Sequence, residues 1–209
     1  MPNISFPIFS QLILFGGGSR PPCPLGRNSY AHTIKLICDI SKNSKQRLMV
    51  AVGSIAEGKN TLYVAFRGCQ SKDDFSSTLD ITMVKSDHGG KVHEGFLDRS
   101  RTLPTDYILK CSDAYDCDSI VTCGHSLGGA VSSILATELM KITQKPVFNI
   151  TFGAPLFCNR DFYKANENIE KNFLHYVNLD DVIPGILSLG NITSILKDSK
   201  MQGKDKKHR

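Results

Sequence analysis

The feature that most constrains this chain is a short apolar stretch, Ile120 to His125, that runs into Ser126 and then into an Ala- and Leu-rich segment ending near Lys141. The first part has the β-branched content of a buried strand, and the last part has the composition of a helix. Between them, Gly124, Ser126 and Gly128 form a Gly-x-Ser-x-Gly pattern. Strand, sharp turn and helix in this order are what a nucleophile elbow requires. The pattern therefore predicts that the backbone presents the hydroxyl of Ser126.

The same turn predicts half of an oxyanion-binding site. A serine at such a corner takes strained backbone angles, which are tolerated only when its neighbours are as small as Gly124 and Gly128. The N–H of Leu127 and the positive end of the helix would then face negative charge that develops beside the hydroxyl. The alternative is an ordinary glycine-rich turn with an incidental serine. The flanking strand and helix patterns favour the elbow.

Length and charge limit the classes of protein to consider. A chain of 209 residues, 41% hydrophobic and 22% charged, suits one α/β domain and is too short for two ordinary ones. The formal net charge is +5, but the segment Lys197 to Arg209 holds six basic residues against two aspartates. The positive charge is thus a property of the tail, and no nucleic-acid partner is expected.

The cysteines and the N-terminus bear on cofactors and location. Seven cysteines without CxxC or Cys/His spacing give no zinc signature, and we expect neither a metal nor a cofactor. The odd number slightly favours the cytoplasm over export, although Cys111 and Cys117 could pair in an exported protein. The apolar segment Ile4 to Phe15 has no basic residue ahead of it and is interrupted by Pro7. It is a weak secretion signal, and it is too short to span a bilayer.

Periodicity predicts the other elements in chain order. A short helix is expected over Ser29 to Ile40, and a β-hairpin over Arg47 to Ile55 and Thr61 to Arg67. An edge strand over Ile81 to Val84 and a turn over Ser86 to Gly90 follow. The remaining expected elements are a long helix from His93 to Tyr115, strands over Pro146 to Phe152 and Phe173 to Asn178, and a helix over Asn159 to Ile169.

Five short blocks occur in a fixed order at workable spacing: Val64 to Gly68, Val92 to Phe96, Gly124 to Ala130, Thr151 to Pro155 and Asp181 to Pro184. From about residue 30 to 187 the chain resembles the class 3 (fungal-type) lipases. This resemblance implies an α/β-hydrolase-type fold, with a mostly parallel central sheet and helices on both faces. It gives a single domain over 29-190 that is short at its C-terminus. Residues 1-28 form an N-terminal segment and linker, and 191-209 form a basic tail that we expect to be disordered.

The resemblance also implies roles for individual residues. Ser126 resembles the nucleophile of the family, Asp181 its catalytic acid and His93 a structural histidine. Gly68 follows the strand Val64 to Phe66 and precedes Cys69. It lets the N–H of Cys69 turn towards the site as the second oxyanion donor beside Leu127. The family usually has Ser or Thr at this place. A small buried cysteine with no catalytic role is the alternative for Cys69.

The catalytic histidine is not located by the sequence. In this fold the histidine follows the acid, but only His208 follows Asp181, within a basic terminal segment whose charge opposes the imidazolium that catalysis needs. His175 precedes the acid in a predicted strand, where a satisfied structural histidine is the simpler interpretation. Three accounts stay open: a missing final segment, an unusual arrangement using His175 or another histidine, or a domain that has lost hydrolysis.

Two functional hypotheses follow. The first is a serine carboxylester hydrolase acting on acyl esters or lipids. The family's lid would fall between Gly68 and His93, where Asp73 to Asp80 offers only Phe75 and Leu79 as strongly apolar residues, so small or soluble esters are favoured over a lipid droplet. The second is a non-catalytic lipase-like module that binds a protein partner, as in the plant disease-resistance lipase-like signalling proteins that the chain also resembles.

Overall fold

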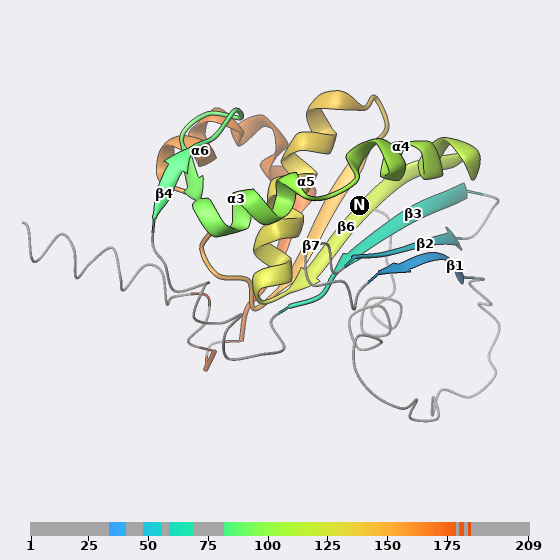
Figure 1. The fold of residues 1–209 in the computed structure, drawn as a ribbon, viewed down its shortest axis with the longest axis horizontal. Coiled ribbons are helices and arrows are strands. Elements are labelled where there is room, and N and C mark those ends of the chain that lie inside the picture. Colours follow the sequence, from blue (N-terminus) through green and yellow to red (C-terminus); the bar gives the residue numbers. More distant parts are fainter. Residues whose placement is uncertain are drawn as a thin grey trace, which may run out of the picture.

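The computed structural model describes residues 34–40, 48–55, 59–68, 82–178, 180, 181 and 184. A six-stranded sheet with the order β1-β2-β3-β6-β7-β8 forms its centre (Figure 1). The pairings from β3 to β8 are parallel, and those of β1 with β2 and β2 with β3 are antiparallel. The α/β class with a mostly parallel sheet is therefore confirmed. The strands are β1 Ile34–Ile40, β2 Leu48–Ile55, β3 Lys59–Phe66, β6 Cys117–His125, β7 Val147–Phe152 and β8 Phe173–Tyr176.

The described helices gather on one face of this sheet (Figure 1). There, Val64 and Ile120 of the sheet share a buried cluster with Phe96, Ile108 and Ile134 of three helices. The opposite face carries a second buried cluster made of strand residues. Among the described residues no helix contributes to this second cluster, and the N-terminal segment and the basic tail lie outside the described residues. The helices are α3 Glu94–Arg101, α4 Thr105–Ala114, α5 Leu127–Ile142, α6 Arg160–Ala165 and the 3-10 helix η1 Glu167–Asn172.

The middle strands are apolar on both faces, as parallel strands covered on both sides require. In β6, Ile120 belongs to one cluster, whereas Val121 and Cys123 belong to the other. Cys123 is 0% exposed, and burial raises the pKa of its thiol to about 12. It therefore acts as a small apolar side chain. The predicted hairpin is also confirmed, because β2 and β3 pair in register from Leu48 opposite Phe66.

Two expectations about local structure are wrong. Ile34–Ile40 is a strand rather than a helix, since pairing with β2 overrides its near-helical spacing. The expected single helix from His93 to Tyr115 is two helices, α3 and α4, separated at Thr102–Pro104. A proline inside a helix removes one hydrogen bond and clashes with the preceding turn, so Pro104 begins a new helix instead.

A separate two-stranded sheet precedes α3. It consists of β4 Met83–Lys85 and β5 Lys91–His93, joined by the predicted turn, in which Ser86 accepts a backbone hydrogen bond from Gly89 (3.1 Å). Gly89 and Gly90 have φ values of 91° and 59°, which suit glycine.

Helix α5 is buried over most of its length and lies against β6 and β7. Its inward polar residues Ser132, Ser133 and Thr137 are at most 1% exposed. In the part of the chain that the structure describes, no helix combines the length and apolar character needed to cross a membrane.

Candidate active site

Ser126 occupies a strained corner between β6 and α5. Its φ of 53° and ψ of −129° lie in a region that non-glycine residues rarely adopt, at a cost of about 1–3 kcal/mol. Two backbone hydrogen bonds hold the corner. The N–H of Ser126 donates to the carbonyl of Phe152 (2.9 Å), and its carbonyl accepts from the N–H of Gly129 (2.8 Å). The side chain is half-buried, so the corner presents the serine at the surface.

Glycines let the surrounding backbone close on this corner. A Cβ on Gly124 would lie 2.3 Å from the carbonyl carbon and oxygen of Gly128, and a Cβ on Gly128 would lie 2.4 Å from the carbonyl oxygen of Phe66. Both contacts are with backbone atoms that cannot rotate away. The glycines of the Gly-x-Ser-x-Gly pattern thus allow the first turn of α5 to dock against the end of β3.

The segment that follows β3 runs directly beside the serine. A Cβ on Gly68 would lie 3.5 Å from the Cβ of Ser126 and 2.7 Å from the carbonyl oxygen of His125. Cys69, predicted as an oxyanion donor, is the next residue and lies outside the described residues. Leu127 begins α5, and the first N–H groups of a helix have no partner within the helix. Its N–H therefore has no acceptor within α5, as the predicted role as an oxyanion donor beside Ser126 requires.

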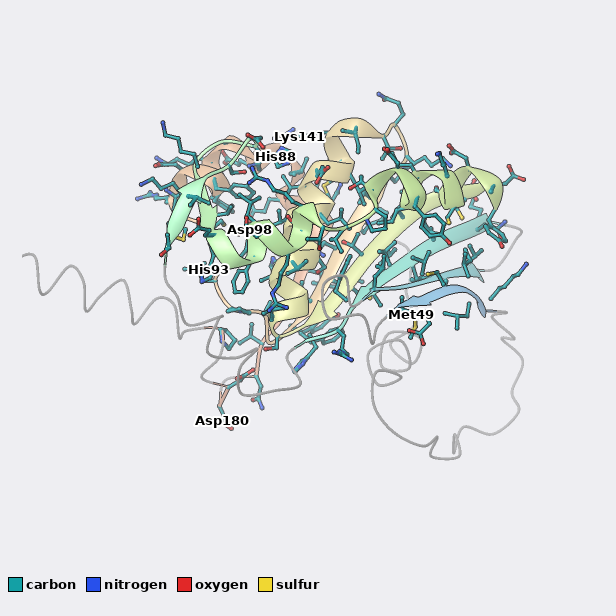
Figure 2. All side chains as sticks on the ribbon, in the orientation of Figure 1. Met49, His88, His93, Asp98, Lys141 and Asp180 are labelled. Carbon is teal, nitrogen blue, oxygen red and sulfur yellow. The ribbon has the colours of Figure 1, made fainter. Side chains whose placement is uncertain are left out.

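The carboxylate of Asp181 lies at the same edge of the sheet. Gly153 follows β7 and donates its N–H to the carbonyl of Tyr176 at the end of β8 (2.8 Å). A Cβ added to Gly153 would be 2.6 Å from Oδ2 of Asp181 and 3.9 Å from Nε2 of His125. Asp181 and His125 thus converge on the residue next to Phe152, whose carbonyl binds the N–H of Ser126. Asp180, the neighbour of Asp181, is exposed and lies below the coloured strands and helices in Figure 2.

The described histidines occupy distinct places. His93 is 1% exposed and stacks on Phe96, with ring centroids 4.2 Å apart, which agrees with a structural role. His88 lies near Lys141, at the end of α5 away from Ser126 (Figure 2). Partial burial lowers the pKa of its ring, and the positive charge of Lys141 lowers it further. The flanking strand and turn suggest a packing role for His125, the residue before Ser126, but its side chain is exposed, so a packing role is wrong.

His175 shares a hydrogen bond of 2.6 Å between its Nδ1 and the Oγ1 of Thr151, on the strand beside it. Desolvation lowers the pKa of its ring. Since Thr151 is 0% exposed, this bond ties one ring nitrogen of His175 to the sheet interior. The arrangement favours the structural interpretation of His175. His32 and His208 lie outside the described residues.

No group of three or more His, Cys, Asp or Glu side chains suited to a metal occurs among the residues that the structure describes. Sequence reasoning also missed two features of the site. Gly153 lies against the carboxylate of Asp181, which the distance of 2.6 Å from an added Cβ to Oδ2 shows, and its φ is positive at 54°. Asn149 is fully buried beneath α5. An asparagine in the middle of an apolar strand was the available signal.

A strained serine between a central parallel strand and a buried helix, with a carboxylate at the end of a neighbouring strand, defines a nucleophile elbow of the α/β-hydrolase fold. Residues 63–190 match the family model of Lipase (class 3), and the chain belongs to this family. The implied fold is thereby confirmed.

Two curated relatives and one solved structure illustrate the similarity. The chain is 26% identical to a lipase of Rhizomucor miehei over 189 residues, which cover 77% of the chain and 51% of the relative. It is 29% identical to phospholipase A1-II 1 of Oryza sativa subsp. indica over 182 residues, covering 72% and 46%. A solved triacylglycerol lipase, whose catalytic centre is formed by a serine protease triad, superposes with a TM-score of 0.60 at 25% identity, covering 73% of this chain and 60% of that one. The chain thus spans about half the length of these curated relatives.

Proposed function

We propose that this chain is a serine carboxylester hydrolase that acts on acyl esters, including those of lipids. The observation that carries the proposal is the strained backbone of Ser126, with φ 53° and ψ −129°, in a chain of the class 3 lipase family. Backbone strain at a non-glycine residue persists at sites where the surrounding structure holds it, and active sites are prominent among them. The lipase and phospholipase A1 relatives support acyl esters as the substrate class.

In the proposed mechanism, Oγ of Ser126 attacks the acyl carbon, and the carbonyl oxygen becomes an oxyanion. The N–H of Leu127 donates to this oxyanion, and the N–H of Cys69 is the proposed second donor. Gly68 lies beside Ser126 and immediately precedes Cys69 in the chain, which supports that second assignment. Collapse of the tetrahedral intermediate releases the alcohol, and water then hydrolyses the acyl–serine ester.

Asp181 is proposed as the acid that orients the catalytic histidine and stabilises its imidazolium form. Its position over Gly153, one residue after the Phe152 carbonyl that binds Ser126, supports this role. We assign no described histidine as the base, since His175 is bound to Thr151 and His93 is stacked beneath the surface. An esterase without one triad member keeps only about 10³–10⁴-fold acceleration over water, so turnover measures whether the base is in place.

Labelling with a fluorophosphonate probe tests the nucleophile, because the probe reacts with activated serines. We expect the native chain to be labelled and the Ser126→Ala variant to be unlabelled. Asp181→Asn should slow labelling without abolishing it. If neither the native chain nor Ser126→Ala is labelled, the hydrolase proposal fails, and a lipase-like module that binds a protein partner becomes the better account.

Substrate form is tested separately. Hydrolysis of a soluble short-chain p-nitrophenyl ester should exceed hydrolysis of an emulsified long-chain ester, because the segment proposed as a lid is mostly polar. We also propose a reducing compartment, which the free thiols of Cys38, Cys111, Cys117, Cys123 and Cys158 support.

A further inference from the structure

A buried polar side chain links the sheet to the helix that follows Ser126. Asn149 lies in the middle of β7 beside Thr122 of β6, and it is 0% exposed. Its Nδ2 donates to Oγ1 of Thr122 (2.9 Å) and to Oγ of Ser132 (3.0 Å). Its Oδ1 accepts from Oγ of Ser133 (2.9 Å). Both N–H groups of the amide therefore have acceptors, which offsets the cost of burying it.

The two serines extend this link to the elbow. Oγ of Ser132 donates to the carbonyl oxygen of Gly129 (2.8 Å), and Oγ of Ser133, whose one proton goes to Asn149, lies 3.0 Å from the same oxygen. The N–H of Gly129 in turn donates to the carbonyl of Ser126 (2.8 Å). A continuous path of hydrogen bonds thus runs from Asn149 through the first turns of α5 to the backbone of Ser126.

Packing alone does not account for an asparagine at this position. Val147 and Ile150 on the same strand are apolar and buried, and a leucine at position 149 would fill similar space without needing partners. The chain instead places three further polar residues around the amide, and Thr122, Ser132 and Ser133 are each 0% exposed. Fully satisfied networks of this kind specify one arrangement of a core more than they add stability.

We propose that Asn149 is a positioning residue for Ser126, because its bonds to Ser132 and Ser133 fix how α5 sits on the sheet and hence where the serine hydroxyl points. This inference rests on the proposed function of Ser126 as the nucleophile. A displacement of about 1 Å at a reacting group can cost on the order of 10²-fold in rate, so a small rotation of α5 is enough to matter.

Three variants of the full chain separate positioning from general stability. Asn149→Leu removes the central amide. Thr137→Val is the matched control, because it removes a hydroxyl that is 1% exposed, lies on the same helix and donates to the carbonyl of Ser133 (3.0 Å). A triple variant combines Asn149→Leu with Ser132→Ala and Ser133→Ala, so that the amide and both serine hydroxyls are removed together, while Oγ1 of Thr122 keeps the carbonyls of Ser132 and Phe148 as acceptors.

The fluorophosphonate labelling rate and the melting temperature are measured for each variant. Asn149→Leu should label about tenfold more slowly or worse, whereas Thr137→Val should stay within about twofold of the native rate. The triple variant should regain melting temperature but not labelling rate. Equal losses of rate in Asn149→Leu and Thr137→Val, or recovery of rate together with melting temperature in the triple variant, would show that Asn149 is only a structural anchor.

A second readout does not depend on a reactive serine. The N–H groups of Gly129 and Ala130 both donate to the carbonyl of Ser126, at 2.8 and 3.3 Å. Their hydrogen exchange, followed by NMR, should be faster in Asn149→Leu and in the triple variant but unchanged in Thr137→Val. If the native chain is not labelled, the proposed function fails while exchange still decides the role of Asn149. Unchanged exchange in Asn149→Leu would overturn it.

Discussion

The carboxylate of Asp181 occupies the space that a side chain on Gly153 would need: an added Cβ would lie 2.6 Å from its Oδ2. Gly153 also has a φ of 54°, so any other residue there would be strained as well as crowded. We predict that Gly153→Ala displaces the acid and lowers the fluorophosphonate labelling rate by at least the amount seen for Asp181→Asn. The strain should cost about 1–2 kcal/mol of unfolding free energy.

Gly89→Ala is the control for this prediction. Gly89 also has a positive φ, 91°, and its added Cβ would be 2.6 Å from the Cβ of Ala165. It lies in the turn between β4 and β5, whereas Gly153 lies at the edge with Ser126. Gly89→Ala should therefore lower the melting temperature without changing the labelling rate. Labelling that stays at the native rate in Gly153→Ala would contradict the assigned position of Asp181.

The strain at Ser126 predicts a stability difference between two inactive variants. Ser126→Ala keeps a Cβ at φ 53°, whereas Ser126→Gly removes it. Since glycine reaches positive φ without the steric cost, Ser126→Gly should be more stable than Ser126→Ala by about 1 kcal/mol in urea unfolding. Both should be unlabelled. Equal stability of the two variants would argue against a strained elbow.

Most of the central fold was predictable because local and tertiary signals agree there. The hairpin of β2 and β3, the elbow and the strand over β7 all have a hydrophobic period that matches their burial. The helix expected over Ser29 to Ile40 is wrong for Ile34–Ile40, because the strand there depends on pairing with β2, and a periodicity argument does not include residues distant in sequence. The break before α4 was readable from Pro104, but the apolar pattern on both sides masked it.

The site was predictable to a different extent for each residue. Ser126 is identified by its local strand–turn–helix pattern, whereas Asp181 came from a resemblance between sequences and has no local signal of its own. The part played by Gly153 depends on where Asp181 returns to the sheet, which sequence spacing does not give. Cys69 as an oxyanion donor stays a prediction, and so does the identity of the base.

Protonation of His175 and His88 predicts how stability changes with pH. Desolvation lowers the pKa of His175, and burial with nearby Lys141 lowers that of His88, both from 6.5. The unfolded chain therefore binds more protons than the folded one as the pH falls below 6.5, and the unfolding free energy decreases there. His175→Gln and His88→Gln should each make this decrease shallower, measured by urea unfolding at about pH 7.5 and pH 5.5.

The two histidine variants lie on separate elements, β8 and the turn before β5, so their effects should be nearly additive in the double variant. Gln at position 175 can still hydrogen-bond to Oγ1 of Thr151, which limits other losses. A native pH dependence that persists in the double variant would show that these rings are protonated equally in the folded and unfolded chain.

In the first turn of α5, a Gly→Ala substitution would raise helix propensity but would also create a steric clash. Replacing an interior helix glycine by alanine gains about 1 kcal/mol from propensity, but a Cβ on Gly128 would lie 2.4 Å from the carbonyl oxygen of Phe66. The contact with backbone should outweigh the gain in propensity, so Gly128→Ala should be destabilised.

A Cβ on Gly129 instead meets the Cβ of Ala154 at 2.7 Å. Because that neighbour is a side chain, the double variant Gly129→Ala with Ala154→Gly should recover part of the melting temperature lost by Gly129→Ala. No such recovery is expected when Ala154→Gly is combined with Gly128→Ala, and recovery there would mean that the end of β3 is not what limits the size of residue 128.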